Sequence, residues 1–84
     1  YKITNTINGK CYIEKSLNIE HRLREHKRNS HSNEHLQNAI KKYGIDNFTF
    51  EVLEECTKEE YDERERYWIS YYKSRNREYG YNII

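Results

Sequence analysis

The chain has 84 residues, of which 35% are charged, and its formal net charge at pH 7 is +1. A chain of this length forms at most one small domain, and the near-neutral charge excludes a uniformly basic nucleic-acid-binding protein, so any basic surface must be local. No apolar run approaches the roughly 20 residues that a membrane span requires, and the two cysteines show neither metal-ligand spacing nor a disulfide framework. We therefore expect a soluble domain that works inside the cell.

The first predicted element is a β-hairpin. Polar and apolar residues alternate over 1–6 and resume over 11–13, with Asn8-Gly9 between them. Asn-Gly is typical of a two-residue type I′ turn, in which both residues need positive φ. Such a turn pairs Ile3 with Glu14, and it places five residues on one face: Tyr1, Ile3, Asn5, Tyr12 and Glu14. From these residues alone, the simpler interpretation is an amphipathic hairpin that packs its tyrosines.

Two helices are predicted next. The first runs from its N-cap Asn18 to about Arg28, and the second covers residues 33–43, with Gly44 as its C-terminal stop. The first helix and its approach form the most basic part of the chain, with Lys15, Arg22, Arg24, Lys27 and Arg28 beside His21 and His26. Charge runs are ordinarily solvated helix faces, but this one is also suited to approach a phosphate backbone.

A strand is predicted over residues 48–53, half buried through Phe48, Phe50 and Val52. Thr57 and Glu60 have the spacing of a capping box that opens a third helix, which runs to about Tyr72. The order β-β-α-α-β-α over residues 1–84 predicts a single α+β domain, an α/β sandwich. Its small three-stranded antiparallel or mixed sheet would be flanked by three helices.

The third helix contains one anomalous carboxylate. Glu65 falls within the apolar stripe formed by Tyr61, Trp68, Ile69 and Tyr72. One interpretation is a boundary residue whose carboxylate reaches solvent or forms a structural ion pair with an arginine such as Arg22. The other is that Glu65 faces a cleft and meets a cation or a reacting group, because a buried charge must be compensated.

Several motifs now fall into one pattern. Tyr12-Ile13 follows Tyr1 after ten intervening residues, Arg22 comes ten residues after Tyr12, and two further segments complete the set: Glu63-Arg64-Glu65 leading to Trp68-Ile69, and Gly80-Tyr81-Asn82-Ile83. In this order and spacing the chain resembles the GIY-YIG endonuclease family over its entire length. The resemblance is strongest to phage and intron-encoded homing endonucleases.

The resemblance implies a set of catalytic residues. Tyr1 and Tyr12 match the tyrosines that activate or orient the attacking water, and Arg22 matches the arginine that stabilises charge on the phosphate. The remaining matches are His26 and His31, which assist proton transfer or bind the phosphate, Glu65, the single metal ligand, and Asn82, a supporting polar residue.

The same resemblance implies a cofactor and a substrate. The cofactor is Mg²⁺ or another divalent cation such as Mn²⁺, and one carboxylate suffices because Mg²⁺ keeps most of its waters. The substrate is double-stranded DNA, and the predicted phosphate contacts are Lys15, Arg22, Arg24, Lys27 and Arg28. We expect a monomeric catalytic domain from an intracellular phage, viral or bacterial setting. As a fragment of a longer protein, it would be tethered to a separate DNA-binding region.

One position departs from the family pattern. The second half-motif reads Tyr12-Ile13-Glu14, where the family has glycine at the last position. The hairpin places Glu14 on the face of both tyrosines, where a carboxylate fills space and repels a phosphate; binding of a second cation is the less favoured alternative. We therefore predict a weakened or inactive endonuclease. A non-catalytic DNA- or protein-binding module and a structure-specific repair nuclease are the alternatives.

Overall fold

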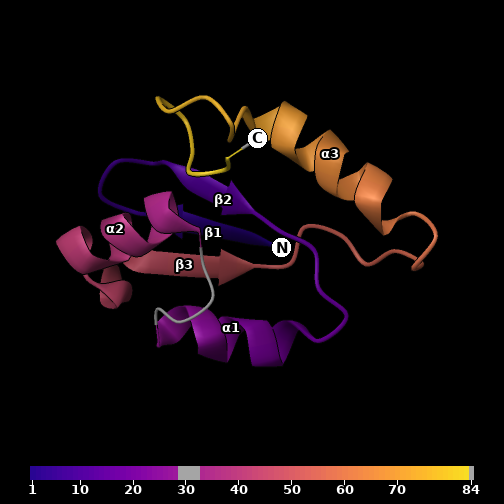
Figure 1. Ribbon diagram of the computed structural model, residues 1–84, viewed down its shortest axis with the longest axis horizontal. Coiled ribbons are helices and arrows are strands. Elements are labelled where there is room, and N and C mark those ends of the chain that lie inside the picture. Colours follow the sequence, from indigo (N-terminus) through magenta and orange to yellow (C-terminus); the bar gives the residue numbers. More distant parts are fainter. Residues whose placement is uncertain (29–32, 84) are drawn as a thin grey trace.

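The computed structural model describes residues 1–28 and 33–83. Its centre is one antiparallel sheet of three strands: β1 (Lys2–Asn5), β2 (Cys11–Ile13) and β3 (Phe48–Glu51). The strand order is β2-β1-β3, and Ile3 of β1 pairs with Tyr12 on one side and with Phe50 on the other (Figure 1). The predicted α+β fold is confirmed, and every pairing among the three strands is antiparallel.

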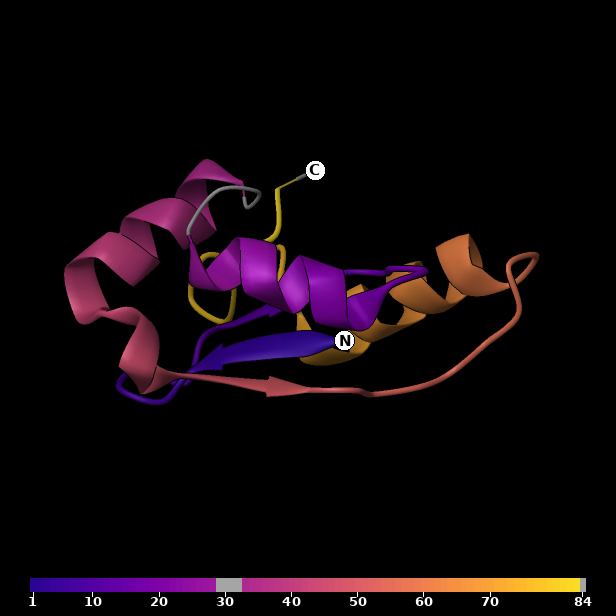
Figure 2. The same cartoon turned by 90° about the horizontal axis from the view of Figure 1, so that it is seen from below.

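Three α-helices accompany the sheet: α1 (Ile19–Lys27), α2 (Glu34–Tyr43) and α3 (Tyr61–Tyr72), with a short 3₁₀ helix at Ile45–Asn47. In Figure 1, α3 lies beside β2 and α1 lies on the side of β3, so the start of β1 is seen between the two helices. Figure 2 shows α1 along the length of the strands and α2 at the end of the sheet. None of the helices in the described part of the chain has the length and apolar character that crossing a bilayer requires.

The first two helices begin where the sequence predicts. Asn18 Oδ1 accepts a hydrogen bond from His21 N (3.1 Å), and Asn33 Oδ1 accepts one from Leu36 N (2.9 Å). Both bonds satisfy backbone donors that the first turn of a helix leaves free. Gly44 ends α2 at φ +83°, a conformation that L side chains rarely adopt. The core then forms from one face of the sheet and α2, through Tyr1, Ile3, Tyr12, Leu36, Ala39, Ile40, Phe48 and Tyr81.

The hairpin register differs from the prediction. Gly9 N donates to Asn5 O (2.8 Å) and Asn5 N donates to Lys10 O (2.9 Å), which closes a four-residue loop in which Asn8 lacks the positive φ of a type I′ turn. The cause is local, because Asn5 Oδ1 accepts from Ile7 N and Asn8 Oδ1 accepts from Lys10 N (both 2.9 Å). The register moves by two residues. A shift of two keeps every side chain on its predicted face.

Two element boundaries were also predicted wrongly. β3 ends at Glu51, so Val52 lies outside the strand, and its side chain is exposed (51%) instead of belonging to the buried face of the strand. α3 begins at Tyr61 rather than near Thr57, because Thr57 Oγ1 donates to the Glu60 carboxylate (2.8 Å) instead of capping the backbone. Residues 57–60 instead form a turn, in which Glu60 N donates to Thr57 O (3.1 Å). The capping-box spacing therefore produces a turn before the helix rather than its first turn.

The C-terminal segment joins the outer edge of β2. Tyr81 N donates to Cys11 O (2.8 Å), and Cys11 N donates to Tyr79 O (3.0 Å). Gly80 lies so close to its neighbours that an added Cβ would be 2.4 Å from the backbone of Ser74 and 2.6 Å from Cys11 O. Only glycine fits this crossing without moving backbone atoms.

We expect Gly80→Ala to lower the free energy of unfolding by more than about 2 kcal/mol, because the new methyl group forces backbone apart. Gly9→Ala is the matched control: its Cβ would meet nothing within 4 Å, and its φ of +77° costs about 1 kcal/mol. Urea unfolding followed by circular dichroism measures both changes. Equal losses in the two variants would show that the contact at Gly80 is not the cause.

Candidate active site

Four of the predicted site residues converge on the Glu14 carboxylate. Its Oε2 accepts hydrogen bonds from Tyr1 Oη (2.9 Å) and Tyr12 Oη (3.1 Å), and lies 3.5 Å from His26 Nε2. Its Oε1 accepts from Arg22 Nη2. Two phenols, one guanidinium and one imidazole thus surround a single anion. The departure from the family pattern lies at the centre of the site.

The fold brings these side chains together from three elements. Tyr1 and Glu14 extend the β1–β2 ladder by one rung, with Glu14 N donating to Tyr1 O (3.1 Å), so their side chains share the face that carries Tyr12. Arg22 and His26 lie one turn apart on α1, a spacing that places both on the same side of the helix. That side faces the tyrosines: the His26 ring centroid is 5.7 Å from that of Tyr1 and 5.8 Å from that of Tyr12.

The hydrogen bonds assign the tautomer of His26, which is fully buried. Tyr1 Oη lies 2.7 Å from His26 Nε2 and 2.9 Å from the Glu14 carboxylate. An ionised carboxylate cannot donate, so the single phenolic proton of Tyr1 goes to Glu14. His26 must then carry a proton on Nε2 and donate it to Tyr1 Oη. A directed chain of hydrogen bonds therefore runs from His26 through Tyr1 to Glu14.

The electrostatics of the site oppose tyrosine ionisation. Burial raises the pKa of Tyr12, and the negative charge of Glu14 raises it further. The same two causes raise the pKa of Tyr1, against a smaller lowering by Arg22. Burial alone would also raise the pKa of Glu14, but the contact with His26, the hydrogen bonds from the tyrosines and the charge of Arg22 together lower it. Glu14 is thus held ionised, and its negative charge compensates the positive charge of Arg22.

A tyrosine titration tests this account. Because the folded pKa values of Tyr1 and Tyr12 lie above the unfolded value of about 10, both phenols stay neutral in the fold, and stability falls as the pH rises from about 10 towards those raised values. We expect Glu14→Gln to move the tyrosinate absorbance change of two tyrosines to lower pH, since burial remains but the carboxylate charge is gone. Glu20→Gln is the control, and superimposable titrations of the parent and Glu14→Gln would contradict the account.

Arg22 keeps one donor unused. Its side chain is 19% exposed, and its Nε atom is buried with no hydrogen-bond partner among the described residues. A buried donor without an acceptor is unfavourable, and guanidinium groups bind phosphate oxygens well. Arg22 therefore has both a charge and a free N–H for an anion that enters the site.

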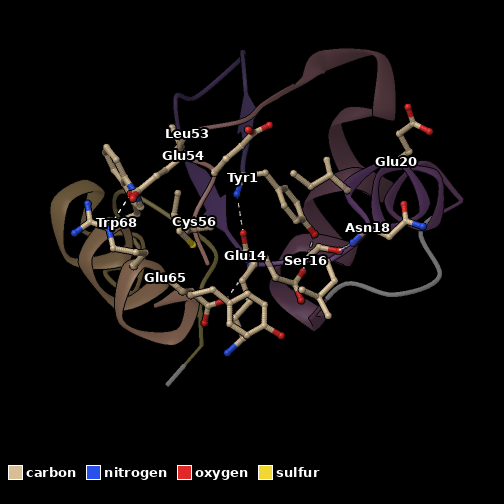
Figure 3. A pocket seen from close by; sticks show the side chains of 17 residues that line it. Tyr1, Glu14, Ser16, Asn18, Glu20, Leu53, Glu54, Cys56, Glu65 and Trp68 are labelled. Atoms are coloured by element: carbon tan, nitrogen blue, oxygen red, sulfur yellow. Dashed lines mark hydrogen bonds and ion pairs between the residues drawn. The ribbon is translucent and has the colours of Figure 1, made fainter. Parts of the chain in front are cut away.

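Glu65 faces a cavity, as the second interpretation of its position predicts. The cavity has a volume of about 430 Å³ and is also lined by Tyr1 and Glu14 (Figure 3). Glu65 is half buried, and its Oε2 accepts a hydrogen bond from Lys15 N (3.0 Å). The alternative of an ion pair with Arg22 is wrong, because the carboxylate partner of Arg22 is Glu14.

The residues around Glu65 fit a metal ion of one type. Residues 1–28 and 33–83 contain no group of three or more His, Cys, Asp or Glu side chains that could hold an ion. A metal ion at Glu65 would therefore have at most two such protein ligands, with the other positions left to water and substrate oxygens. Mg²⁺ tolerates such a site, because it keeps several waters and takes one or two carboxylates together with phosphates. The donor set suits Mg²⁺ or Mn²⁺ and does not suit a structural zinc site.

Asn82 contacts the backbone next to the site. Its Oδ1 accepts from Ile13 N (2.8 Å) and its Nδ2 donates to Ile13 O (2.9 Å). The side chain thus pairs with β2 as another strand residue would, directly before Glu14. In this arrangement Asn82 positions the site.

The predicted phosphate contacts separate into two groups. Arg22 and Lys15 are paired with carboxylates, Lys15 with that of Asp62. Arg24, Lys27 and Arg28 are exposed on α1 and its C-cap, away from the buried side of His26. His31, the other predicted histidine, lies outside the described residues.

One cluster on the cavity wall was not predicted from the sequence. Arg64 Nε (2.8 Å) and Trp68 Nε1 (2.9 Å) both donate to Glu54 Oε1, which fixes the segment after β3 against α3. All three residues line the cavity that holds Glu65, and Figure 3 shows Glu54 beside Trp68. The four-residue spacing of Arg64 and Trp68 was the available signal, but it does not identify a carboxylate ten residues earlier.

Comparisons with known proteins match both the sequence and the fold of this chain. A family profile described as "GIY-YIG catalytic domain" matches residues 1–81. The catalytic domain of intron endonuclease I-TevI, in a glutamate-to-alanine mutant, superposes with a TM-score of 0.86 at 32% identity, over 99% of this chain and 89% of that one. A structure of the catalytic domain of homing endonuclease I-TevI gives 0.82 at 31% identity, over 99% and 94% of the two chains.

A longer relative is similar in sequence. The probable intron-encoded endonuclease 1 of Neurospora crassa is 42% identical over 59 residues, which are 70% of this chain and 19% of that protein. This chain thus corresponds to a small part of its relative. With the family profile matched from Tyr1 to Tyr81 and the same fold in two solved catalytic domains, the chain belongs to the GIY-YIG family.

Proposed function

We propose that this chain is a divalent-metal-dependent endonuclease domain of the homing type, which hydrolyses phosphodiester bonds in double-stranded DNA and is slowed by its own Glu14. One observation carries the proposal. Two phenols, a guanidinium and an imidazole converge on one anion position, and the Glu65 carboxylate lines the same cavity. The relatives, a probable intron-encoded endonuclease and a homing endonuclease catalytic domain, support the same reaction class.

Phosphodiester hydrolysis requires the groups that meet here. Charge builds on the phosphate as water attacks, and Arg22 offers a positive charge with an unused N–H to hold it. We propose that Tyr1 and Tyr12 orient the water and that one of them, once ionised to its phenolate, takes the proton of the water, while His26 donates a hydrogen bond to Tyr1. A Mg²⁺ or Mn²⁺ ion held by Glu65 would supply further neutralisation of charge at the phosphate and the leaving oxygen.

Glu14 competes with the substrate for these groups. Its carboxylate takes the hydrogen bonds of Arg22, Tyr1 and Tyr12 that a phosphate oxygen would otherwise receive. A second negative charge about 4 Å from an entering phosphate costs about 1–4 kcal/mol, depending on the local dielectric. Glu14 also raises the pKa of both tyrosines and so opposes their use as bases. We therefore propose a slow enzyme whose rate is limited by this one side chain.

Glu65→Ala tests the metal-dependent reaction. We expect plasmid cleavage in Mg²⁺ to fall at least a hundredfold, because the proposed metal ligand is lost, while Glu63→Ala, an exposed glutamate on the same helix, keeps the parent rate. Both variants should melt cooperatively near the parent temperature. If the parent rate is too low to follow, the comparison is made in a Glu14→Gly background. Undiminished metal-dependent cleavage by Glu65→Ala, or its global unfolding, would contradict the proposed role.

A second function is favoured by the same position. A domain that kept the fold and lost the chemistry would tolerate a carboxylate at Glu14, and it would then serve as a DNA- or protein-binding module. Cleavage by Glu14→Gly distinguishes the two functions, because removing one side chain restores only a site that is otherwise complete. A structure-specific repair nuclease would instead prefer branched DNA to a plain duplex.

We also propose that target recognition resides in another part of a longer protein. The near-neutral net charge of +1 gives this domain little non-specific affinity for DNA of its own. The relative from Neurospora crassa matches over only 19% of its length, which leaves room for a separate DNA-binding region. A footprint of this chain alone on target DNA should therefore show weak sequence preference.

A further inference from the structure

A second cavity lies on another side of α3, at its C-terminal end. It has a volume of about 400 Å³ and is lined by Arg66, Ile69, Ser70, Lys73, Arg75 and Asn76. We call it the α3 cleft. Three of its six lining residues are cations and none is a carboxylate, so its electrostatic potential is positive.

The cations of the α3 cleft differ in their carboxylate pairing from most of the cations near the sheet and the active site. Four basic residues there are paired with carboxylates: Lys2 with Glu51, Lys15 with Asp62, Arg22 with Glu14 and Arg64 with Glu54. Within residues 1–28 and 33–83, no such pair involves Arg66, Lys73 or Arg75. Two carboxylates lie about one turn before Arg66: Asp62, which Lys15 binds and whose pKa the charge of Arg66 also helps to lower, and the exposed Glu63. The α3 cleft therefore keeps most of its positive charge.

The chain that forms the α3 cleft is fixed by its own hydrogen bonds. Lys73 ends α3 in the left-handed conformation (φ +54°), and Asn76 N donates to Lys73 O (2.9 Å). Asn76 O accepts from Tyr79 N and Gly80 N, both at 2.9 Å. Gly80 is in turn wedged against Ser74. Like charges held together on a rigid loop repel one another, and a bound polyanion relieves that repulsion.

The charge around the active-site cavity indicates the direction in which DNA leaves it. That cavity is lined by five carboxylates, against two cations: Glu14, Glu20, Glu54, Glu55 and Glu65, with Lys15 and Arg64. A duplex backbone is repelled by the acidic segment after β3. The α3 cleft is the cavity of opposite charge on the same helix, so a duplex held at the active site is drawn along α3 towards it.

We propose that the α3 cleft binds backbone phosphates of the DNA duplex whose phosphodiester enters the active site. The proposal rests on the proposed function for the identity of the polyanion. Glu65 and Lys73 are eight residues apart, which is about 12 Å along a helix. This distance is the separation along the helix axis alone, and the α3 cleft lies on another side of α3. At 3.4 Å per step, the contacted phosphates therefore lie at least about three to four base pairs from the bond that is cut.

The test is the salt dependence of DNA binding. A fluorescent duplex of roughly 20 base pairs is titrated with the chain in EDTA, so that cleavage does not intervene, at several salt concentrations. The α3 variant carries Arg66→Gln, Lys73→Gln and Arg75→Gln. The matched control carries Lys41→Gln, Lys42→Gln and Lys58→Gln, three exposed lysines that line neither cavity. Both variants have the same net charge, and thermal melts confirm that both fold.

Each phosphate contact contributes about 0.9 to the slope of log K against log salt. We expect the slope of the α3 variant to be less steep than that of the parent by about 2 to 2.7, with the control within about 0.5 of the parent. Equal loss in both variants would show a net-charge effect and overturn the proposal, as would no loss in the α3 variant or no salt-dependent duplex binding by the parent.

Cleavage is scored separately, so the two proposals fail in different ways. If the α3 variant loses salt slope but Glu14→Gly cleaves no DNA, the proposed DNA binding at the α3 cleft stands and the proposed nuclease function is overturned. If Glu14→Gly cleaves DNA but the α3 variant keeps the salt slope of the parent, the proposed nuclease function stands and the proposed DNA binding at the α3 cleft is overturned. If the triple variant melts early, Arg66→Gln with Arg75→Gln, which leaves the Lys73 backbone untouched, should still reduce the slope by about 1.8. An unchanged slope in that double variant would also overturn the cleft.

Discussion

Replacing Glu14 with glycine is expected to raise the rate of Mg²⁺-dependent DNA cleavage about tenfold to a hundredfold. Relief of a repulsion of about 1–3 kcal/mol between the carboxylate and the entering phosphate accounts for such a gain. The substitution also returns the hydrogen bonds of Arg22, Tyr1 and Tyr12 to the substrate. Single-turnover cleavage of an end-labelled duplex, with the enzyme in excess, measures the chemical step.

The same substitution should make the fold less stable. Arg22 loses its carboxylate and the two buried phenols lose an acceptor, which costs about 1–3 kcal/mol in the free energy of unfolding. Activity and stability thus move in opposite directions, as expected of a side chain that fits the folded state and obstructs the substrate. Glu14→Gln removes the charge of the side chain but keeps its volume, so it should give a smaller gain in rate. Glu20→Gln, on the wall of the same cavity, should give none, and a parent-like rate in Glu14→Gly would contradict the role of Glu14.

Replacing Arg22 with alanine is expected to lower cleavage about a hundredfold to a thousandfold in the Glu14→Gly background. A preorganised donor aimed at transition-state charge has effects of this size. Arg77→Ala, at an exposed arginine that lines neither cavity, is the control and should change the rate less than threefold. Because a lysine cannot reproduce the planar donor geometry of guanidinium, Arg22→Lys should recover only part of the loss.

Arg22 should also be coupled to Glu14 in stability. In the parent, Arg22→Ala leaves a largely buried carboxylate without its cation and costs about 3 kcal/mol. In Glu14→Gly the same change should cost less, so the double-mutant cycle gives a coupling energy of about 1–3 kcal/mol. Urea unfolding of the four proteins measures it. Additive effects would show that the ion pair contributes nothing to the folded state.

Features governed by neighbours in sequence were predictable. Asn18 and Asn33 cap their helices because an N-cap needs only a side-chain oxygen three residues before a free N–H. Glu14 and the tyrosines share a face because side chains alternate along a strand. This prediction is correct although the predicted register was wrong by two residues, because a shift of two leaves each side chain on the same face. Arg22 and His26 lie on one side of α1 because residues four positions apart are neighbours on the surface of a helix.

Features that depend on tertiary partners were not predictable. The four-residue spacing of Arg22 and His26 does not say that both meet Glu14, because that contact depends on how α1 packs against the sheet. The contact of Asn82 with Ile13 joins residues 69 positions apart. At the hairpin, the Asn8-Gly9 pattern competed with side-chain bonds from Asn5 and Asn8, and the local competition decided the turn.

We propose that the groups around Glu14 and Glu65 form a complete nuclease site obstructed by one carboxylate. The most direct measurement is cleavage of a DNA duplex by Glu14→Gly with Mg²⁺ and with EDTA, beside the same protein carrying Glu65→Ala. The account predicts cleavage in Mg²⁺ that is faster than that of the parent, none in EDTA, and none with Glu65→Ala. A Glu14→Gly protein that folds and binds DNA but leaves it uncut in Mg²⁺ would contradict the claim and identify the domain as a binding module.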